Sequence, residues 1–236
     1  MNSMAELRAE VCRANLDLVA HGLVMGTWGN VSGIDRAAGL VAIKPSGIAY
    51  SELTADAMVV TDLTGHVIAG SLRPSSDLQT HLELYRQWPH VRGIAHTHSP
   101  CATAFAQARL SIPCLGTTHA DHFCGSVPVT RDLTPAETAS DYELNTGRLI
   151  VETFLRRDPL QVPAVLVASH GPFTWAVDPH HAVWHSAVLE AVARMALDTW
   201  RLQEDCDPIP DHLLERHFRR KHGPHAYYGQ GHQTGM

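Results

Sequence analysis

The sequence lacks cysteine pairs, long apolar runs and an excess of positive charge, three features that would each identify a specialised class of protein. It has five cysteines in 236 residues, none in a C-x-x-C pair, which argues against a disulfide framework and a cysteine-based zinc site. It shows no apolar run of transmembrane length and no signal-peptide pattern, so we expect neither a membrane span nor a signal peptide. Its formal net charge of -6 argues against a general nucleic-acid binder. We therefore expect a cytoplasmic protein that binds neither membranes nor nucleic acid.

The composition that remains is that of a soluble globular protein, with 44% hydrophobic and 18% charged residues. A length of 236 residues suits one domain with a sizeable core. The sequence contains no internal repeat and no linker long enough to divide it. We therefore expect a single domain over residues 1–236, ending in a tail rich in Gly, His and Tyr over about 222–236.

Hydrophobic periodicity predicts strands that alternate with helices. The predicted strands cover residues 40–43, 58–62, 66–69, 91–98, 111–116 and 164–168, and residues 27–32 are predicted to form a strand or strand edge that contains a glycine. The predicted helices are a first helix that ends near Gly22, followed by residues 78–88, 100–108, 134–155, 178–200 and 211–221. Because hairpins occur among these elements, we expect an α/β fold with a central mixed or mostly antiparallel sheet, covered by helices in α/β/α layers.

Two histidines alternate at the end of the strand predicted over residues 91–98. Residues i and i+2 of a strand point to the same face, so His96 and His98 are expected to project side by side. Two imidazoles on one face supply half of a divalent-metal site. The chain has 17 histidines, however, so chance His-x-His pairs are also expected. The pair alone therefore does not establish a metal site.

Further titratable groups lie at the ends of other predicted elements. Asp77 stands at the start of the helix over 78–88, and His170 follows the strand over 164–168. Together with His96 and His98 they could form a Zn²⁺ site with room for a substrate, and Mn²⁺ or Co²⁺ remain possible alternatives.

A second group of residues is suited to bind an anion. It combines an amide, a lysine, hydroxyl groups and a helix start, and consists of Asn30, Lys44, Ser46, Gly47, Ser75 and Ser76. Simple helix capping would need only one of the three polar residues Ser75, Ser76 and Asp77. A metal beside a phosphate site suggests a phosphorylated sugar whose carbonyl and hydroxyl oxygens chelate the metal.

These residues stand in motifs that resemble the class II aldolase/adducin superfamily over nearly the whole chain. The motifs occupy residues 27–32, 43–47, 74–77, 96–99, 116–121, 169–173 and 221–230. Within the superfamily, the Thr-Thr-His-Ala-Asp stretch over 117–121 and the Tyr-Tyr-Gly-Gln stretch over 227–230 resemble the L-ribulose-5-phosphate 4-epimerases. Asp77 stands where the aldolases of the superfamily usually have Glu, which favours the same subgroup. The extension after residue 230 departs from the usual end.

The resemblance implies a role for each matching residue. It implies that His96, His98 and His170 bind the metal, with Asp77 in or beside its shell. The implied phosphate and substrate cradle consists of Gly29, Asn30, Ser46, Gly47, Ser75 and Ser76, with Lys44 close by. Asp121 and Tyr228 would be acid/base residues on opposite faces of the substrate, so the tail would contribute to the site. The resemblance further implies a class II aldolase-like fold and a homotetramer, with Thr117 and His217 supplied across subunit interfaces.

The implied activity is the interconversion of L-ribulose 5-phosphate and D-xylulose 5-phosphate. C4 of a ketopentose has no acidic C–H, so inversion requires cleavage and re-formation of the C3–C4 bond, with Lewis-acid help from the metal. Two acid/base groups are then needed, one for each face. The alternatives are a class II sugar-phosphate aldolase, of the kind that acts on L-fuculose 1-phosphate, and a non-catalytic interaction domain like that of adducin.

Some of these residues also have ordinary structural explanations. Asp121 could be a turn residue or helix cap, and Tyr228 could belong to a loose tail. Trp28 and Trp175 are expected to pack in the core. The remaining such residues are His119 and His122, interpreted as structural or exposed, and the basic cluster Arg216, Arg219, Arg220 and Lys221, interpreted as a solvated helix face.

Overall fold

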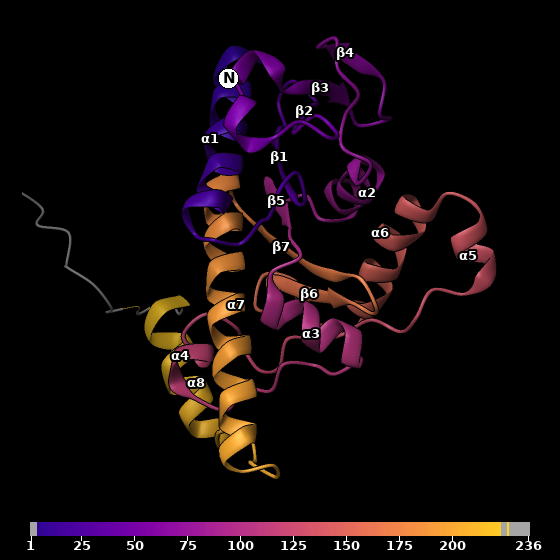
Figure 1. Cartoon of the computed structure of the whole chain (residues 1–236). Helices are drawn as coiled ribbons and strands as arrows, with labels where there is room; N and C mark the ends of the chain where they lie inside the picture. Colours follow the sequence, from indigo (N-terminus) through magenta and orange to yellow (C-terminus); the bar gives the residue numbers. More distant parts are fainter. Residues whose placement is uncertain (1–3, 223–225, 227–236) are drawn as a thin grey trace, which may run out of the picture.

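The computed structural model describes residues 4–222 and residue 226, and its centre is a sheet of seven strands (Figure 1). The strands are β1 (Asn30–Asp35), β2 (Leu40–Ile43), β3 (Val59–Asp62), β4 (Val67–Ala69), β5 (Gly93–His96), β6 (Ala164–Val167) and β7 (Gly171–Ala176). Their order is β4-β3-β2-β1-β5-β7-β6. All neighbouring pairs of these strands are antiparallel, which narrows the prediction of a mixed or mostly antiparallel sheet.

Helices cover both faces of this sheet. They are α1 (Met4–Ala20), α2 (Leu78–Gln87), α3 (Pro100–Ala108), α4 (Thr117–Ala120), α5 (Pro135–Ala139), α6 (Tyr142–Thr153), α7 (Pro179–Leu202) and α8 (Asp211–His222), with 3-10 turns η1 (Tyr50–Glu52) and η2 (Ala55–Ala57). Along β5, Ile94 packs in the core cluster that contains α2 residues, and Ala95 packs in the cluster shared by α1 and α7. Successive strand residues face opposite sides, so the predicted layered α/β architecture is confirmed.

The register of the central strands brings distant residues together. Asn30 in β1 lies opposite His96 in β5, and His96 lies opposite Phe173 in β7. Neighbouring strands lie about 4.8 Å apart, so three segments that are far apart in the sequence meet at one end of the sheet. The candidate site is built at this end.

Two sequence predictions about the elements were wrong, and one strand was missed. Residues 111–116 do not form a strand, and only Ile112 makes an isolated bridge, to Val127. The helix predicted over 134–155 is divided into α5 and α6, because Asp141 adopts a left-handed conformation with φ of 49°. Strand β7 was not predicted, because its Gly-Pro start is typical of a turn.

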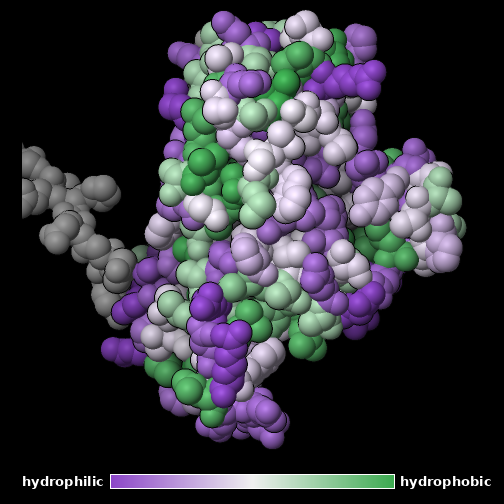
Figure 2. Space-filling model, viewed as in Figure 1, coloured by the Kyte–Doolittle hydropathy of each residue, from purple (hydrophilic) through white to green (hydrophobic). Residues whose placement is uncertain are grey.

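The surface mixes polar and apolar residues on the face shown in Figure 2. Hydrophobic residues gather there near the end of α1 and the loop that follows it. The exposed fractions in this region are 47% for Val19, 70% for Met25 and 58% for Trp28. Within residues 4–222 and 226, no helix has both the length and the apolar character needed to cross a membrane.

Candidate metal centre

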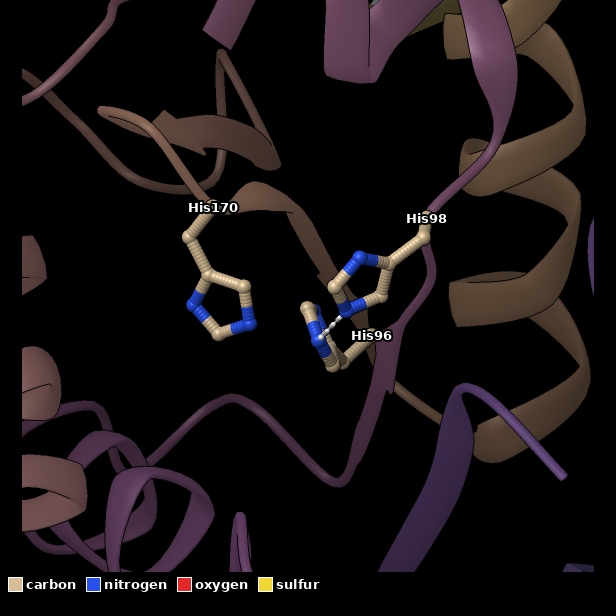
Figure 3. A group of neighbouring side chains, drawn as sticks. All are labelled: His96, His98 and His170. Carbon is tan, nitrogen blue, oxygen red and sulfur yellow. Dashed lines mark hydrogen bonds between the residues drawn. The ribbon is translucent and has the colours of Figure 1, made fainter. Parts of the chain in front are cut away.

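Three histidine rings converge at the end of the sheet (Figure 3). His96 is the last residue of β5, His98 precedes α3, and His170 lies on the turn between β6 and β7. One ring nitrogen from each lies within 4.8 Å of the other two. Ser169 adopts a left-handed conformation with φ of 62°, and the tight turn that results places His170 opposite the other two rings.

The hydrogen bonds of the rings prepare them to bind a metal ion. The Nδ1 of His96 lies 2.9 Å from the carbonyl oxygen of Pro172, and a carbonyl only accepts, so Nδ1 carries the proton. The lone pair of His96 Nε2 is therefore available to a metal ion. This nitrogen lies 3.1 Å from Nε2 of His98. In a tetrahedral site with Zn–N bonds of about 2.0–2.1 Å, two nitrogens lie about 3.3 Å apart. The separation therefore fits two ligands of one ion.

The remaining electrostatics also favour a cation. Burial, followed by the nearby His96, lowers the pKa of His170 to about 3, so its ring is neutral and has a lone pair to donate. Burial would raise the pKa of the Asp77 carboxyl, but His96, His81 and a hydrogen bond from Asn30 hold it below its ordinary value. The donor atoms that converge are those of the three imidazoles, a set suited to Zn²⁺, and the Asp77 carboxylate lies outside that group.

Asp77 faces the site because it does not cap its own helix. It occupies the N-cap position of α2, yet its side chain makes no capping hydrogen bond. Instead, its Oδ2 accepts a hydrogen bond of 2.6 Å from the amide of Asn30 in β1. The carboxylate is thereby held beside the three rings.

One cavity of about 480 Å³ joins the metal residues to the predicted anion-binding residues. It is lined by all seven predicted cradle residues from residues 29–76, by Asp77 and by the three histidines. The sequence analysis missed Thr27, Trp28 and Pro45 in its wall. Trp28 was predicted to pack in the core, and this was wrong, because 58% of it is exposed. The predicted burial of Trp175 is confirmed.

Lys44 brings an uncompensated positive charge to this cavity. The residue is 2% exposed, and its ammonium group contacts the carbonyl oxygens of Thr27 and Pro45 at 3.3 and 3.4 Å and lies over the Tyr50 ring. Within the described chain it has no carboxylate partner, and burial lowers its pKa. An anionic ligand would supply the missing negative charge.

The two loops of the cradle are tied to each other. The amide of Ser46 donates to the carbonyl of Arg73 at 2.9 Å, and the amide of Ser75 donates to the carbonyl of Lys44 at 2.9 Å. These bonds hold segments 44–47 and 73–77 side by side, so that Ser46, Ser75 and Ser76 line one cavity.

Asp121 belongs to a different group of side chains. Its carboxylate accepts hydrogen bonds from Nδ1 of His217 at 3.0 Å and Nε of Arg220 at 2.9 Å, and Nζ of Lys221 lies 3.5 Å away. Burial would raise the pKa of Asp121, but Arg220 and His217 hold it below its ordinary value, so the group is ionised at neutral pH. The interpretation of the basic cluster as a solvated face was therefore wrong for Arg220 and Lys221.

The two groups lie apart within one chain. Thr117, Asp121 and His217 do not line the cavity that contains the metal residues. Figure 1 shows α4 and α8 beside α7, on the side away from the sheet. Tyr228, the other predicted acid/base residue, lies outside the described residues.

Other histidines near these groups have structural roles. His119 is 3% exposed, and its Nε2 lies 2.9 Å from the carbonyl of Gly125. His122 is partly buried, and burial lowers its pKa to about 4. The interpretation of both as structural or exposed residues is consistent with these positions.

A sequence model described as the class II aldolase and adducin N-terminal domain matches residues 9–197. The chain belongs to this family. Among solved structures, this class II aldolase domain is similar to an L-fuculose 1-phosphate aldolase, with 26% identity and a TM-score of 0.78 over 93% of this chain and 97% of that one. Membership of this family confirms the predicted superfamily and fold, and it supports the predicted metal-binding character.

Two further structures share the fold of this class II aldolase domain. One is a putative aldolase/epimerase/decarboxylase from Klebsiella pneumoniae, with 22% identity and a TM-score of 0.72 over 92% of this chain and 99% of that one. The other is an L-fuculose-1-phosphate aldolase from Thermus thermophilus, with 24% identity and a TM-score of 0.67 over 85% of this chain and 98% of that one.

Proposed function

We propose that this protein is a metal-dependent enzyme that breaks and re-forms a carbon–carbon bond of a ketose phosphate, as an L-ribulose-5-phosphate 4-epimerase. The observation that supports this most directly is the shared cavity, which combines three converging imidazoles with a buried lysine that has no carboxylate partner within the described residues. A sugar phosphate could bind the metal through its neighbouring carbonyl and hydroxyl oxygens and bind Lys44 through its phosphate group.

Each part of the cavity has a distinct task in this proposal. A divalent ion held by His96, His98 and His170 would supply Lewis acidity that polarises the C2 carbonyl. Lys44 and the hydroxyl groups of Ser46, Ser75 and Ser76 bind the phosphate and fix the substrate's orientation. Zn²⁺ is the ion that best fits the three nitrogen donors.

The chemistry at C4 explains why cleavage is needed. C4 is not adjacent to the carbonyl, so its hydrogen is not acidic. Breaking the C3–C4 bond, with loss of the C4 hydroxyl proton, gives the enediolate of dihydroxyacetone and glycolaldehyde phosphate, because the phosphate is on C5. Rotation of the aldehyde and re-formation of the bond from its other face, with return of the proton, inverts C4.

Asp121 and Tyr228 are proposed to exchange that proton on the two faces. The Asp121 carboxylate is ionised and so can accept a proton, while His217 and Thr117 lie near it as supporting groups. Because this group is remote from the cavity of its own chain, we propose that it serves the cavity of a neighbouring subunit in a homotetramer. The exposed Met25 and Trp28 near the cavity are suited to such a contact.

A second candidate is an aldolase that releases its aldehyde. The 26% identity with an L-fuculose 1-phosphate aldolase over nearly the full length of both chains favours it. The Asp121 group and Asp77, in place of the usual Glu, favour the epimerase. A non-catalytic adducin-like role is disfavoured, because the complete histidine set is present and converges.

A direct assay distinguishes these functions. Protein reconstituted with Zn²⁺ is incubated with L-ribulose 5-phosphate and, separately, with L-fuculose 1-phosphate. The epimerase forms D-xylulose 5-phosphate without net release of glycolaldehyde phosphate. Release of dihydroxyacetone phosphate from L-fuculose 1-phosphate, without epimerisation, would establish the aldolase instead. Retention of either activity after a chelator has removed all metal would contradict the proposed chemistry.

A further inference from the structure

His81 is completely buried immediately behind the candidate metal centre, and no role has been given to it above. It lies in α2, one helical turn after Asp77, and its exposed fraction is 0%. Burial lowers the pKa of His81 to about 3, so its ring is neutral. A neutral imidazole has one N–H donor and one acceptor nitrogen, and which nitrogen has the proton depends on the neighbours.

One side of the ring belongs to a chain of buried hydroxyl groups. The Nδ1 of His81 lies 2.7 Å from Oγ of Ser32, which in turn lies 2.8 Å from the hydroxyl of Tyr85. Ser32 and Tyr85 are both 0% exposed. The Nε2 of His81 is also buried, and it has no hydrogen-bond partner within the described residues.

The chain of hydroxyl groups determines the direction of the hydrogen bonds. Burial raises the pKa of Tyr85, so its hydroxyl keeps its proton, and Ser32 is its side-chain acceptor within the described residues. Ser32 then donates to Nδ1 of His81, which leaves the proton of the ring on Nε2. In the opposite arrangement, Nδ1 of His81 would donate to Ser32 and Ser32 would donate to Tyr85. The Tyr85 proton would then have no acceptor, and the lone pair of His81 Nε2 would face the negative charge of Asp77.

The nearby negative charge is that of Asp77. Residues i and i+4 of a helix lie on one face, about 6 Å apart at Cβ, so the His81 ring lies near enough to Asp77 for an electrostatic interaction, although no hydrogen bond joins the two side chains in this structure. The negative charge of Asp77 acts on the ring in the direction of a higher pKa. The other side of the ring contacts the edge of Phe173 at 6.0 Å between centroids, and Phe173 stacks on His96 at 4.1 Å.

We propose that His81 is a positioning residue of the metal centre, whose buried Nε2–H stabilises the ionised Asp77 carboxylate electrostatically while Ser32 and Tyr85 keep the proton on that nitrogen. Residues that orient the groups around a metal commonly change its affinity about 10–100-fold when they are replaced. This inference rests on the metal site of the proposed function, but not on the choice between epimerase and aldolase.

Two substitutions of His81 test this inference. The amide nitrogen of His81→Gln can occupy the place of Nε2, whereas that of His81→Asn reaches only the place of Nδ1. The affinity for Zn²⁺, measured by competition with a chromophoric chelator, should fall about 10-fold in His81→Asn and less than about 3-fold in His81→Gln. Tyr85→Phe, which removes only the hydroxyl group, should give an intermediate loss.

His185→Asn is the matched control. His185 is a partly buried histidine whose Nδ1 bonds to the carbonyl of Trp175, outside the site, so this variant should lose thermal stability and keep its affinity for Zn²⁺. A role of His81 in packing alone would lower the melting temperature of both His81 variants and leave their affinity for Zn²⁺ unchanged. That result, or equal losses of affinity in both, would overturn the inference. Failure of the unaltered protein to bind Zn²⁺ would instead contradict the proposed function.

Discussion

Single residues decide how closely the backbone approaches the metal centre, and Gly29 is the clearest case. Its φ is +76°, and an added Cβ would lie 2.8 Å from the carbonyl oxygen of His96 and 2.9 Å from the Val24 side chain. We expect Gly29→Ala to lower the free energy of unfolding by about 2–4 kcal/mol, because strain in the left-handed region adds to a steric clash. Urea unfolding followed by circular dichroism measures this loss.

Gly47 provides the control for that prediction. Its φ of +70° is similar, but nothing lies within 4 Å of an added Cβ. Gly47→Ala should therefore show only the backbone strain, about 1 kcal/mol. Equal losses in the two variants would show that the contact with His96 is unimportant.

The buried His119 makes stability depend on pH. Burial lowers its pKa to about 4 in the folded protein, below the value of about 6.5 in an unfolded chain. Between these values the unfolded state binds more protons, so the contribution of His119 is constant above pH 6.5 and stability falls as the pH drops towards 4. The slope for one histidine is at most about 1.4 kcal/mol per pH unit.

Urea unfolding at several pH values, with a chelator present, tests this prediction. His119→Gln should flatten the dependence of stability on pH by up to one proton between about pH 6.5 and 4. An unchanged slope in the variant would mean that His119 does not remain neutral in the folded protein. The chelator is needed because a bound metal would add its own competition with protons.

At the scale of elements, α7 holds the start of α3 and hence the loop that carries His98. The carboxylate of Glu190 in α7 accepts hydrogen bonds from the N–H of Cys101 at 2.8 Å and of Ala102 at 2.9 Å. These N–H groups are free at the beginning of a helix, and a negative charge there is favourable. The contact therefore joins two helices and fixes the chain immediately after the proposed metal ligands His96 and His98.

Replacement of Glu190 should destabilise the protein in proportion to the number of acceptor oxygens that are removed from the start of α3. We expect Glu190→Leu to lower the free energy of unfolding by about 1–2 kcal/mol, because two buried N–H groups lose their acceptor. Glu190→Gln keeps one acceptor oxygen and should lose about half as much. Unfolding curves that place both variants level with the unaltered protein would exclude a capping role.

At the scale of the whole molecule, the separation of the cavity from the Asp121 group makes a prediction about assembly. His98→Asn removes a proposed metal ligand from every site, and Asp121→Asn removes the proposed acid/base group, so each variant alone should be inactive. If the two parts belong to neighbouring subunits, co-assembly at equal amounts should restore roughly a quarter of the activity by random pairing. Co-assembled oligomers, verified by native mass spectrometry, that show no recovery would place both parts in one subunit.

Much of the architecture followed from local sequence patterns. The bounds of α3 were predicted to the residue, and those of α2 and β6 to within one residue, because apolar periodicity and helix-start residues act locally. The hairpin of β3 and β4 followed from the turn residues between them. The division of the helix predicted over 134–155 depended on the backbone of Asp141, which no periodicity reveals.

The candidate site was predictable by residue type but not by arrangement. The two-residue repeat of a strand indicated that His96 and His98 project side by side, and their rings do meet, although β5 ends at His96 and His98 lies in the loop that follows. Only the tertiary structure decided that the carbonyl of Pro172, 76 residues away, fixes the proton of His96, and that Asp121 pairs with Arg220, 99 residues away. Such contacts depend on how the packed elements are placed relative to one another. Local propensity does not encode that placement. The sequence therefore predicted which residue types form the site, and the tertiary structure was needed to show which atoms contact each other.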